Sequence, residues 1–258
     1  SFYSNFVALV AVLGIFSPAF ADITLDYSNP QKASENMTLT VVNDKAAVQF
    51  KDEVGGNTRM VFNKADNKLY MVMDDRKQYM DMDAMMKTMG DLSGMLSGMM
   101  KDLPADAQGQ LGDLLGGLMG GNKEEPAPAP DPVLKETGET EEIAGFQCAL
   151  ATLQSQDQTT ELCLAQPSKV GISDADFAVM QAMLLKQKEA VEKASDMIGM
   201  QDIGFNPGDI DRMPLRISQI SGAGAGSVSE LRAVREQADT SAVVIPDDYA
   251  PMQMPGIQ

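Results

Sequence analysis

The sequence predicts an α+β protein, in which helices pack on the concave face of a curved antiparallel sheet. Between residues 22 and 82, apolar and polar residues alternate with a period of two through several short segments. This pattern is expected of strands that bury one face. The period then changes to three or four residues, first over 83–103 and again after residue 173. Such spacing is typical of amphipathic helices.

The first strands are short and are joined by polar turns. Ile23, Leu25 and Tyr27 fall on one face of the first of them, and Asn29-Pro30 ends it. Five further segments alternate in the same way, at residues 37–41, 46–50, 60–62, 69–73 and 78–82. We therefore expect an antiparallel meander with one buried face.

The segment 83–119 is rich in Met and Gly and is predicted to be a helical insertion. Its apolar positions at helical spacing are Met85, Met86, Met89, Leu92, Leu96, Met99, Met100 and Leu103. Gly90, Gly94 and Gly98 form a second stripe, and each costs about 1 kcal/mol relative to Ala inside a helix. This helix should be weak and should depend on what it packs against. Residues 120–135 contain alternating Pro and Ala and are predicted to be a solvated linker.

Strand character resumes at Glu136 and leads into a predicted hairpin that holds Cys148 and Cys163, the two cysteines of the chain. If the hairpin turns at Ser155 and Gln156, the two cysteines lie directly opposite each other. Opposed strand residues have Cβ atoms roughly 4.5–5.5 Å apart, and a modest local twist brings them to disulfide distance. We therefore predict a disulfide between them.

Three features organise the rest of the chain. Ser173 and Asp176 form an S-x-x-D capping box that opens a long helix. Residues 213–220 and 228–234 are expected to be strands. The tail at 243–246 is expected to dock on the edge of the sheet. We treat 22–258 as a single domain.

Residues 1–21 are predicted to be a secretory signal peptide. They carry no charge, contain an apolar run at 6–16 and end in Ala19-Phe20-Ala21, which fits an A-x-A cleavage site. The apolar run is too short to span a bilayer. A buried N-terminal helix is the alternative. Export after cleavage at Ala21 implies a periplasmic or secreted protein, in a compartment that favours the disulfide.

Composition excludes several functional classes. The chain has no His, which removes Ser-His-Asp and Cys-His nucleophile systems and His-ligated metal sites. The formal net charge of −17 argues against nucleic acid as a partner, because such binding depends on Lys and Arg at phosphates. It also argues against adhesion to anionic membranes.

Three groups of residues are candidates for functional sites. The Met residues between 71 and 119 could bind Cu(I) through thioether sulfur, but their strand and helix spacing favours a flexible apolar face that lines a core or cavity. Four acidic residues do not match a calcium-loop pattern and are expected to form a turn and a helix start: Asp74, Asp75, Asp81 and Asp83. The run 222–226 lacks the Lys-Ser/Thr of a phosphate loop and is expected to connect two strands.

Six scattered pieces resemble an exported bacterial family known as domain of unknown function 4412. They are Leu69–Tyr79, Thr137–Cys148, Glu161–Ala165, Gly171–Phe177, Met213–Arg216 and Ile245–Tyr249. That family has no assigned reaction, so the resemblance implies no catalytic residue. Its strand-rich layout is similar in turn to the LolA/LolB-type periplasmic lipoprotein carriers, in which a curved half-barrel sheet wraps helices around an apolar cavity. The Met- and Gly-rich insertion and the Pro-rich linker depart from that layout.

These observations favour a non-catalytic exported protein that binds an apolar or lipid-like ligand, without a cofactor or metal. The expected ligand-binding residues are Leu69, Met71, Met73, Met85, Met89 and Leu92. A Met-based Cu(I)-binding protein and an envelope interaction protein without a small ligand are the alternatives. An enzyme based on unrecognised carboxylates ranks last.

The first testable prediction concerns export. Cleavage after Ala21 should give a mature protein whose first residue is Asp22, because the A-x-A motif places small residues where the peptidase needs them. N-terminal sequencing of the protein from the periplasmic fraction measures this. A mature protein that still carries residues 1–21 would contradict the prediction.

Overall fold

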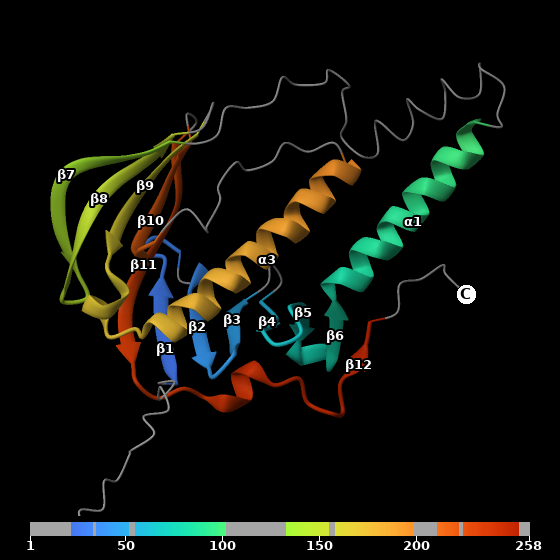
Figure 1. The fold of residues 1–258 in the computed structure, drawn as a ribbon, viewed down its shortest axis with the longest axis horizontal. Helices are drawn as coiled ribbons and strands as arrows, with labels where there is room; N and C mark the ends of the chain where they lie inside the picture. The colour runs from blue at the N-terminus through green and yellow to red at the C-terminus, as the bar shows by residue number, and fades with distance from the viewer. Residues whose placement is uncertain are drawn as a thin grey trace, which may run out of the picture.

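The computed structural model describes residues 22–32, 35–51, 55–101, 133–154, 158–198, 211–221 and 224–252. The predicted signal peptide, residues 102–119 of the insertion, residues 120–132 of the linker and the hairpin turn at 155–157 lie outside the described residues. In the described part, twelve strands form one sheet, accompanied by two long helices (Figure 1). The chain is therefore an α+β protein with a mostly antiparallel sheet, as predicted.

The first six strands form the predicted meander. They are β1 (Ile23–Ser28), β2 (Met37–Val42), β3 (Lys45–Lys51), β4 (Asn57–Asn63), β5 (Lys68–Met73) and β6 (Gln78–Asp81). Each pairs antiparallel with the next along the chain. Asn43 and Asn67, each at φ 54°, occupy the left-handed region in two of the turns, a conformation that Asn tolerates better than most residues. We refer to these strands as the platform.

The second half of the chain adds β7 (Val133–Ile143), β8 (Phe146–Gln154), β9 (Gln158–Ala165), β10 (Met213–Ser221), β11 (Gly224–Arg235) and β12 (Ala250–Pro251). The order across the sheet is β12-β6-β5-β4-β3-β2-β1-β11-β10-β9-β8-β7. β12 pairs parallel with β6, and all other neighbours are antiparallel. Since β7 begins at Val133, the last three residues of the predicted 120–135 linker belong to a strand.

Strands β7–β11, which we call the wing, curl strongly. β7 contacts β11 although three strands separate them in the sheet. Arg216 of β10 also forms an ion pair with Glu141 of β7, with 2.6 Å between Nη2 and Oε2. β7 is an edge strand with mostly exposed, charged or polar residues, and such residues discourage pairing with another chain.

The two helices begin at well-formed caps. α1 (Met82–Lys101) begins after Asp81, whose Oδ1 accepts from the backbone N–H groups of Asp83 and Ala84 at 3.0 and 3.2 Å. α3 (Asp174–Ile198) begins at the predicted capping box, in which Ser173 Oγ accepts from the Asp176 N–H at 3.1 Å. α3 contacts β2, β3 and β5, whereas α1 contacts β5, β6 and α3. Figure 1 shows both helices on the same side of the platform.

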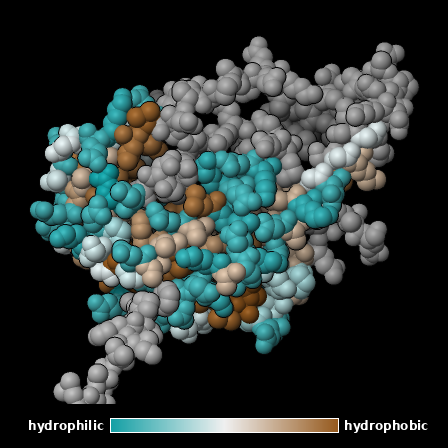
Figure 2. All heavy atoms as spheres, in the orientation of Figure 1, coloured by the Kyte–Doolittle hydropathy of each residue, from teal (hydrophilic) through white to brown (hydrophobic). Residues whose placement is uncertain are grey.

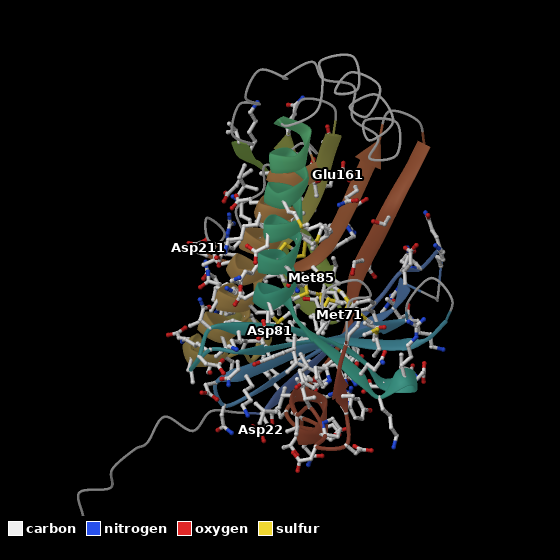
Figure 3. All side chains as sticks on the ribbon, turned by 90° about the vertical axis from the view of Figure 1, so that its right-hand side faces the viewer. Asp22, Met71, Asp81, Met85, Glu161 and Asp211 are labelled. Atoms are coloured by element: carbon white, nitrogen blue, oxygen red, sulfur yellow. A yellow bond between two sulfur atoms is a disulfide. The ribbon has the colours of Figure 1, made fainter. Side chains whose placement is uncertain are left out.

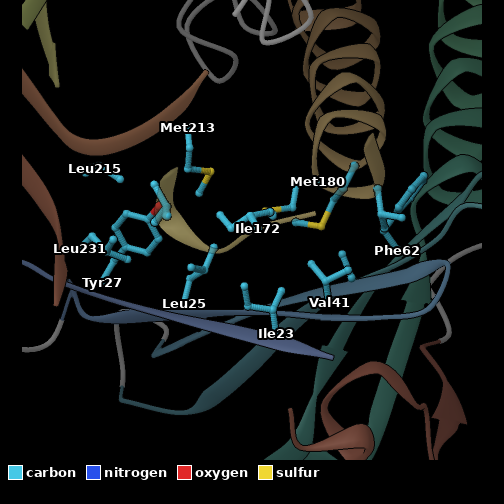
Figure 4. Packing of buried hydrophobic residues seen from close by; sticks show 14 of the residues in the cluster. Ile23, Leu25, Tyr27, Val41, Phe62, Ile172, Met180, Met213, Leu215 and Leu231 are labelled. Atoms are coloured by element: carbon cyan, nitrogen blue, oxygen red, sulfur yellow. The ribbon is translucent and has the colours of Figure 1, made fainter. Parts of the chain in front are cut away.

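The main core lies between α3 and the sheet. Figure 4 shows Ile23, Leu25 and Tyr27 of β1 packed in one layer with Ile172 and Met180. The hydroxyl of Tyr27 donates to the carbonyl of Pro214 at 2.9 Å, and burial raises the pKa of this phenol well above its usual value. This hydrogen bond satisfies the polar tip of a side chain that is otherwise part of the core.

The expectation of a single buried face is wrong for the platform. A second apolar cluster forms on the opposite face from Val42, Ala47, Val61, Val72 and Val243. The alternate positions of β2–β5 are thus also apolar. They are covered by the segment that contains the 3₁₀ helix η5 (Thr240–Val243), which contacts β2, β3 and β4. The predicted tail at 243–246 therefore docks on a face of the sheet, and β12 beyond it occupies the edge.

The predicted disulfide is present, but its register is not the expected one. Cys148 and Cys163 are bonded, with Cα atoms 5.3 Å apart. Cys163 pairs with Leu150 across β8 and β9, so the cysteines are diagonal rather than direct neighbours. The turn of this hairpin had no Asn-Gly signature to fix its position. Both cysteines are buried in the main core, at 3% and 0% exposure.

The second testable prediction concerns this disulfide. Replacing both cysteines by Ala should lower the free energy of unfolding by about 3 kcal/mol, because the bridge closes a loop of 15 residues in the unfolded chain. Urea denaturation of the variant and of the wild type measures the loss. Reductant should lower the wild-type midpoint and leave the variant unchanged. Equal midpoints without reductant would contradict the prediction.

Candidate functional site

Three of the predicted ligand-binding residues meet at the base of α1. Leu69 of β5 is completely buried in the main core. Met71 of β5 and Met85 of α1 are partly buried against the same core. Figure 3 shows Met71 and Met85 where α1 rises from the sheet. These three side chains form an apolar surface shared by the strand and the helix, which we call the α1 base.

The other three predicted residues are half-buried or exposed. Met73 and Met89 are half-buried, and Leu92 is 57% exposed. Leu92 is therefore not enclosed with the α1 base. The reason is geometric, because α1 continues away from the sheet beyond its first turns (Figures 1 and 3). Met95, one turn further on, is 65% exposed.

A buried lysine ties α1 to α3. The ammonium of Lys186, whose side chain is 8% exposed, lies 2.9 Å from Asp83 Oδ1 on α1 and 3.2 Å from Glu189 Oε2 on α3. Burial disfavours its charge, but the hydrogen bonds to the two carboxylates hold the pKa of Lys186 above its usual value. Since Asp83 lies in the first turn of α1, this contact fixes only the beginning of that helix.

The four acidic residues considered as a cation site each have a protein partner instead. Asp74 pairs with Arg59, and Asp75 accepts from the backbone N–H of Asn57 at 2.7 Å. Asp81 pairs with Lys68 at 2.9 Å, and Asp83 pairs with Lys186. Burial opposes the ionisation of Asp81, but Lys68 and the backbone N–H of Ala84 hold its pKa below its usual value. In the described residues, no group of three His, Cys, Asp or Glu side chains is arranged to hold a metal ion.

The Met-based copper hypothesis concerns residues that the structure describes only in part. Met95 is exposed on α1, and the side chains of Met99 and Met100 lie outside the described residues. Met60 of β4 has a different partner, since its sulfur accepts from Gln187 Nε2 of α3 at 3.5 Å. Copper binding therefore stays a hypothesis.

A polar network centred on Arg59 lies on the face of the platform that is covered by η5, which we call the outer face. This guanidinium is almost completely buried and makes a bidentate contact with Asp74, at 2.8 Å from Nε and 2.7 Å from Nη2. Its Nη1 donates to the carbonyls of Ser241, Ala242 and Val244, at 3.1, 2.7 and 3.1 Å. Arg59 thus holds residues 241–244 against the sheet. They belong to the stretch 238–249, which packs on this face and which we call the C-terminal segment.

Tyr249 completes this network by donating from its hydroxyl to Asp74 Oδ1 at 3.0 Å. Burial, followed by the contact with Asp74, raises the pKa of Tyr249 above its usual value. Further along, Lys77 pairs with Asp248 at 2.7 Å. The sequence signal for this arrangement was the position of Arg59 two residues before Val61. Residues two apart on a strand lie on the same face, so an Arg beside a buried Val needs a buried partner. That signal was missed because the outer face was expected to be solvated.

An open pocket of about 330 Å³ adjoins the Arg59 network. Its lining is largely polar and consists of Asn36, Gln49, Phe50, Lys51, Asn57, Thr58, Arg59 and Asp74. The donors of Arg59 and the carboxylate of Asp74 already have partners within the protein. The pocket therefore offers a surface for weak polar contacts.

The chain is an α+β protein that is rich in antiparallel sheet and contains a disulfide between Cys148 and Cys163. The family model described as "Domain of unknown function (DUF4412)" matches residues 121–249, and the chain belongs to this family. A search of curated proteins returned no match. The matched residues include the wing, α3 and the C-terminal segment, whereas Leu69–Tyr79 lies before them. None of the helices in the described ranges is long and apolar enough to cross a membrane.

The third testable prediction concerns Arg59. Replacing Arg59 by Leu should destabilise the protein by about 3 kcal/mol or more, because the change strands the Asp74 carboxylate and several carbonyls. Tyr249→Phe removes one hydrogen bond and should cost about 1 kcal/mol. Arg76→Leu, at an exposed position of the neighbouring turn, is the control and should change stability by less than about 0.5 kcal/mol. Denaturant titration measures all three, and equal effects of Arg59→Leu and Arg76→Leu would contradict the assignment.

Proposed function

We propose that this protein is an exported, non-catalytic binding protein for an apolar, lipid-like ligand. In this proposal the curved sheet acts as a half-barrel of the kind found in LolA/LolB-type carriers, with α1 and α3 on its concave side. The ligand lies at the α1 base, between Leu69 and Met71 of β5 and Met85 and Met89 of α1.

One observation carries the proposal, namely that the apolar stripe of α1 begins in the core at Met82 and Met86 and reaches solvent at Leu92. Met82 and Met86 are 9% and 8% exposed, whereas Leu92 and Met95 are 57% and 65% exposed. On α3, Leu184 and Leu185 are also exposed, and Figure 2 shows apolar atoms over the middle of that helix within a mostly polar surface. Contiguous exposed apolar surface is a common mark of a binding site.

The glycines of α1 support a helix that can move. A Cβ atom added at Gly94 or Gly98 would meet no atom within 4 Å, so close packing does not require these glycines. Each nevertheless costs about 1 kcal/mol of helix stability relative to Ala. The helix is therefore weak in its outer half and is fixed mainly at its start by Asp83 and the buried Met residues. In this proposal the outer half of α1 swings away from α3 to admit the ligand.

Methionine suits such an opening site. Its unbranched side chain and polarisable sulfur adapt to irregular apolar shapes. Each buried CH₂ group of an acyl chain contributes roughly 0.8 kcal/mol, so such a ligand needs no charged anchor. The carboxylates near α1 are already committed to Lys68 and Lys186, which favours binding over acid–base catalysis.

The fourth testable prediction is saturable binding of a fluorescent fatty acid, displaced by phospholipid. Met89→Glu should weaken this binding at least tenfold, because it places a charge beside the acyl chain at a half-buried position. Val244→Glu adds the same charge on the C-terminal segment, where Val244 is 48% exposed, and should change the affinity less than twofold. Fluorescence titration measures both variants, and circular dichroism checks their folding.

The same experiment separates the alternatives. Met89→Leu removes the sulfur but keeps the volume, so lipid binding should persist, whereas Cu(I) binding through Met would weaken. Tight stoichiometric Cu(I) binding that is lost in Met→Leu variants at positions 89, 95, 99 and 100 would favour the copper protein. Absence of saturable probe binding by the wild type would overturn the carrier proposal and favour an interaction protein.

A further inference from the structure

In the first turn of α3, the buried carboxylate of Asp176 forms no ion pair with a described Lys or Arg side chain. Asp176 is completely buried. Its Oδ2 accepts from Ser173 Oγ at 2.5 Å, as part of the capping box. Its Oδ1 has no hydrogen-bond partner among the described residues, and the described ion pairs do not include Asp176. A buried carboxylate oxygen without a hydrogen-bond donor is energetically costly, so its environment calls for a donor.

The negative charge of Asp22, the residue that precedes β1, also acts on Asp176. Burial raises the pKa of Asp176 above its usual value, hydrogen bonds from Ser173 lower it, and the negative charge of Asp22 raises it further. Asp22 directly precedes β1, and Ile23 packs in the same core cluster as Ile172 and Val179, which flank the capping box. The start of β1 and the start of α3 therefore bring two acidic side chains into one region.

We propose that Asp176 is the receptor for the N-terminal ammonium group of the mature protein, created when the leader is removed at Ala21–Asp22. The reaction is hydrolysis by an endopeptidase of the export machinery. Water adds across the peptide bond, Ala21 leaves with a new carboxylate, and the Asp22 nitrogen takes up a proton to become an ammonium. The inference rests on the predicted cleavage site and is independent of the ligand proposal.

The chemistry of the new group matches what the site lacks. Before cleavage, the Asp22 nitrogen is an uncharged amide with one N–H. After cleavage it carries a positive charge and three donors, which can satisfy Asp176 Oδ1 and offset the repulsion between the two carboxylates. A charge-assisted hydrogen bond of this kind is roughly twice as strong as a neutral one.

Such a contact would make folding depend on maturation. It joins Asp22, the residue that precedes β1 in the middle of the sheet, to the first turn of α3. The precursor would lack this contact and would be less stable than the mature form. A less stable precursor suits export, because unfolding must precede passage through a secretion channel.

The test compares proteins that differ only at the N-terminus. One begins at Asp22 and one at Ala21, each produced by removing a cleavable leader, and the full chain from Ser1 is the third. The Ala21 form keeps the charge but displaces the ammonium by one residue. The inference predicts that the Asp22 form has the highest urea midpoint, and that Asp176→Asn removes its advantage over the Ala21 form. Asn retains an acceptor for the capping box, so the helix start is preserved.

The pH profile supplies a readout that a merely structural Asp176 would not change. The α-amino group has a pKa of about 7.7–8.0 in an unfolded chain, and pairing with Asp176 should raise it in the folded state. The advantage of the Asp22 form should then be complete below about pH 8 and be lost as the pH rises through the folded-state value. A rise of one unit corresponds to about a tenfold change in the unfolding equilibrium constant.

Two results would overturn the inference. One is equal urea midpoints of the Asp22 and Ala21 forms in the wild-type background. The other is a difference between the Asp22 and Ala21 midpoints that is the same in the Asp176→Asn background as in the wild type. If Asp176→Asn does not fold, the pKa of the α-amino group is measured by NMR in the otherwise unaltered Asp22 form. A value at or below that of an unstructured peptide would then overturn the inference, and a raised value would support it.

Discussion

The pairing of β1 with β11 is the constraint on which the rest of the fold depends. β1 lies between β2 and β11, so it joins the platform, built from the first eighty residues, to a wing that comes from the second half of the chain. Residue pairs such as Thr24 with Arg235 are brought together across almost the whole described sequence. Closing so long a loop is costly in entropy, and burial of Ile23, Leu25 and Tyr27 against α3 offsets that cost. Without this pairing the platform and the wing would be separate sheets with unpaired edges.

The same constraint explains why the two helices differ. α3 follows β9 and the 3₁₀ helix η3 (Pro167–Val170) and crosses the platform, where it contacts β2, β3 and β5 and buries Val179, Met180 and Met183. α1 follows β6, near the far edge, where the platform offers only β5 and β6 for contact. An amphipathic helix is stabilised mainly by what its apolar face packs against. The position of α1 in the sheet order therefore leaves Leu92 and Met95 exposed.

Local patterns in the sequence were sufficient to predict the elements, because strand alternation, the S-x-x-D cap and the polar turns are each encoded over a few residues. The six-strand meander, the start of α3 and the disulfide pairing were predicted for this reason. Non-local arrangements were not accessible in the same way. Nothing near Cys148 defines the register that places Cys163 opposite Leu150, and the covering of Val61 and Val72 depends on a segment about 180 residues later in the chain. The predicted ligand residues were chosen by periodicity alone, which places Leu92 on the correct stripe of α1 but cannot tell where that stripe leaves the sheet.

The second buried face also restricts how the molecule can open. Arg59, with its buried contacts to Asp74 and three carbonyls, anchors the C-terminal segment, and β12 extends the sheet beyond β6. The outer side of the platform is thus covered by a segment held through charge-assisted hydrogen bonds, which are strong in a buried setting. On the other side of the platform, α3 contacts β2, β3 and β5, and α1 contacts β5, β6 and α3. α1 is held at its start by Asp83 and by the buried Met82 and Met86. In the proposed carrier function, the ligand would therefore enter along the Met-rich face of α1, because Arg59 holds the C-terminal segment on the other side of the platform.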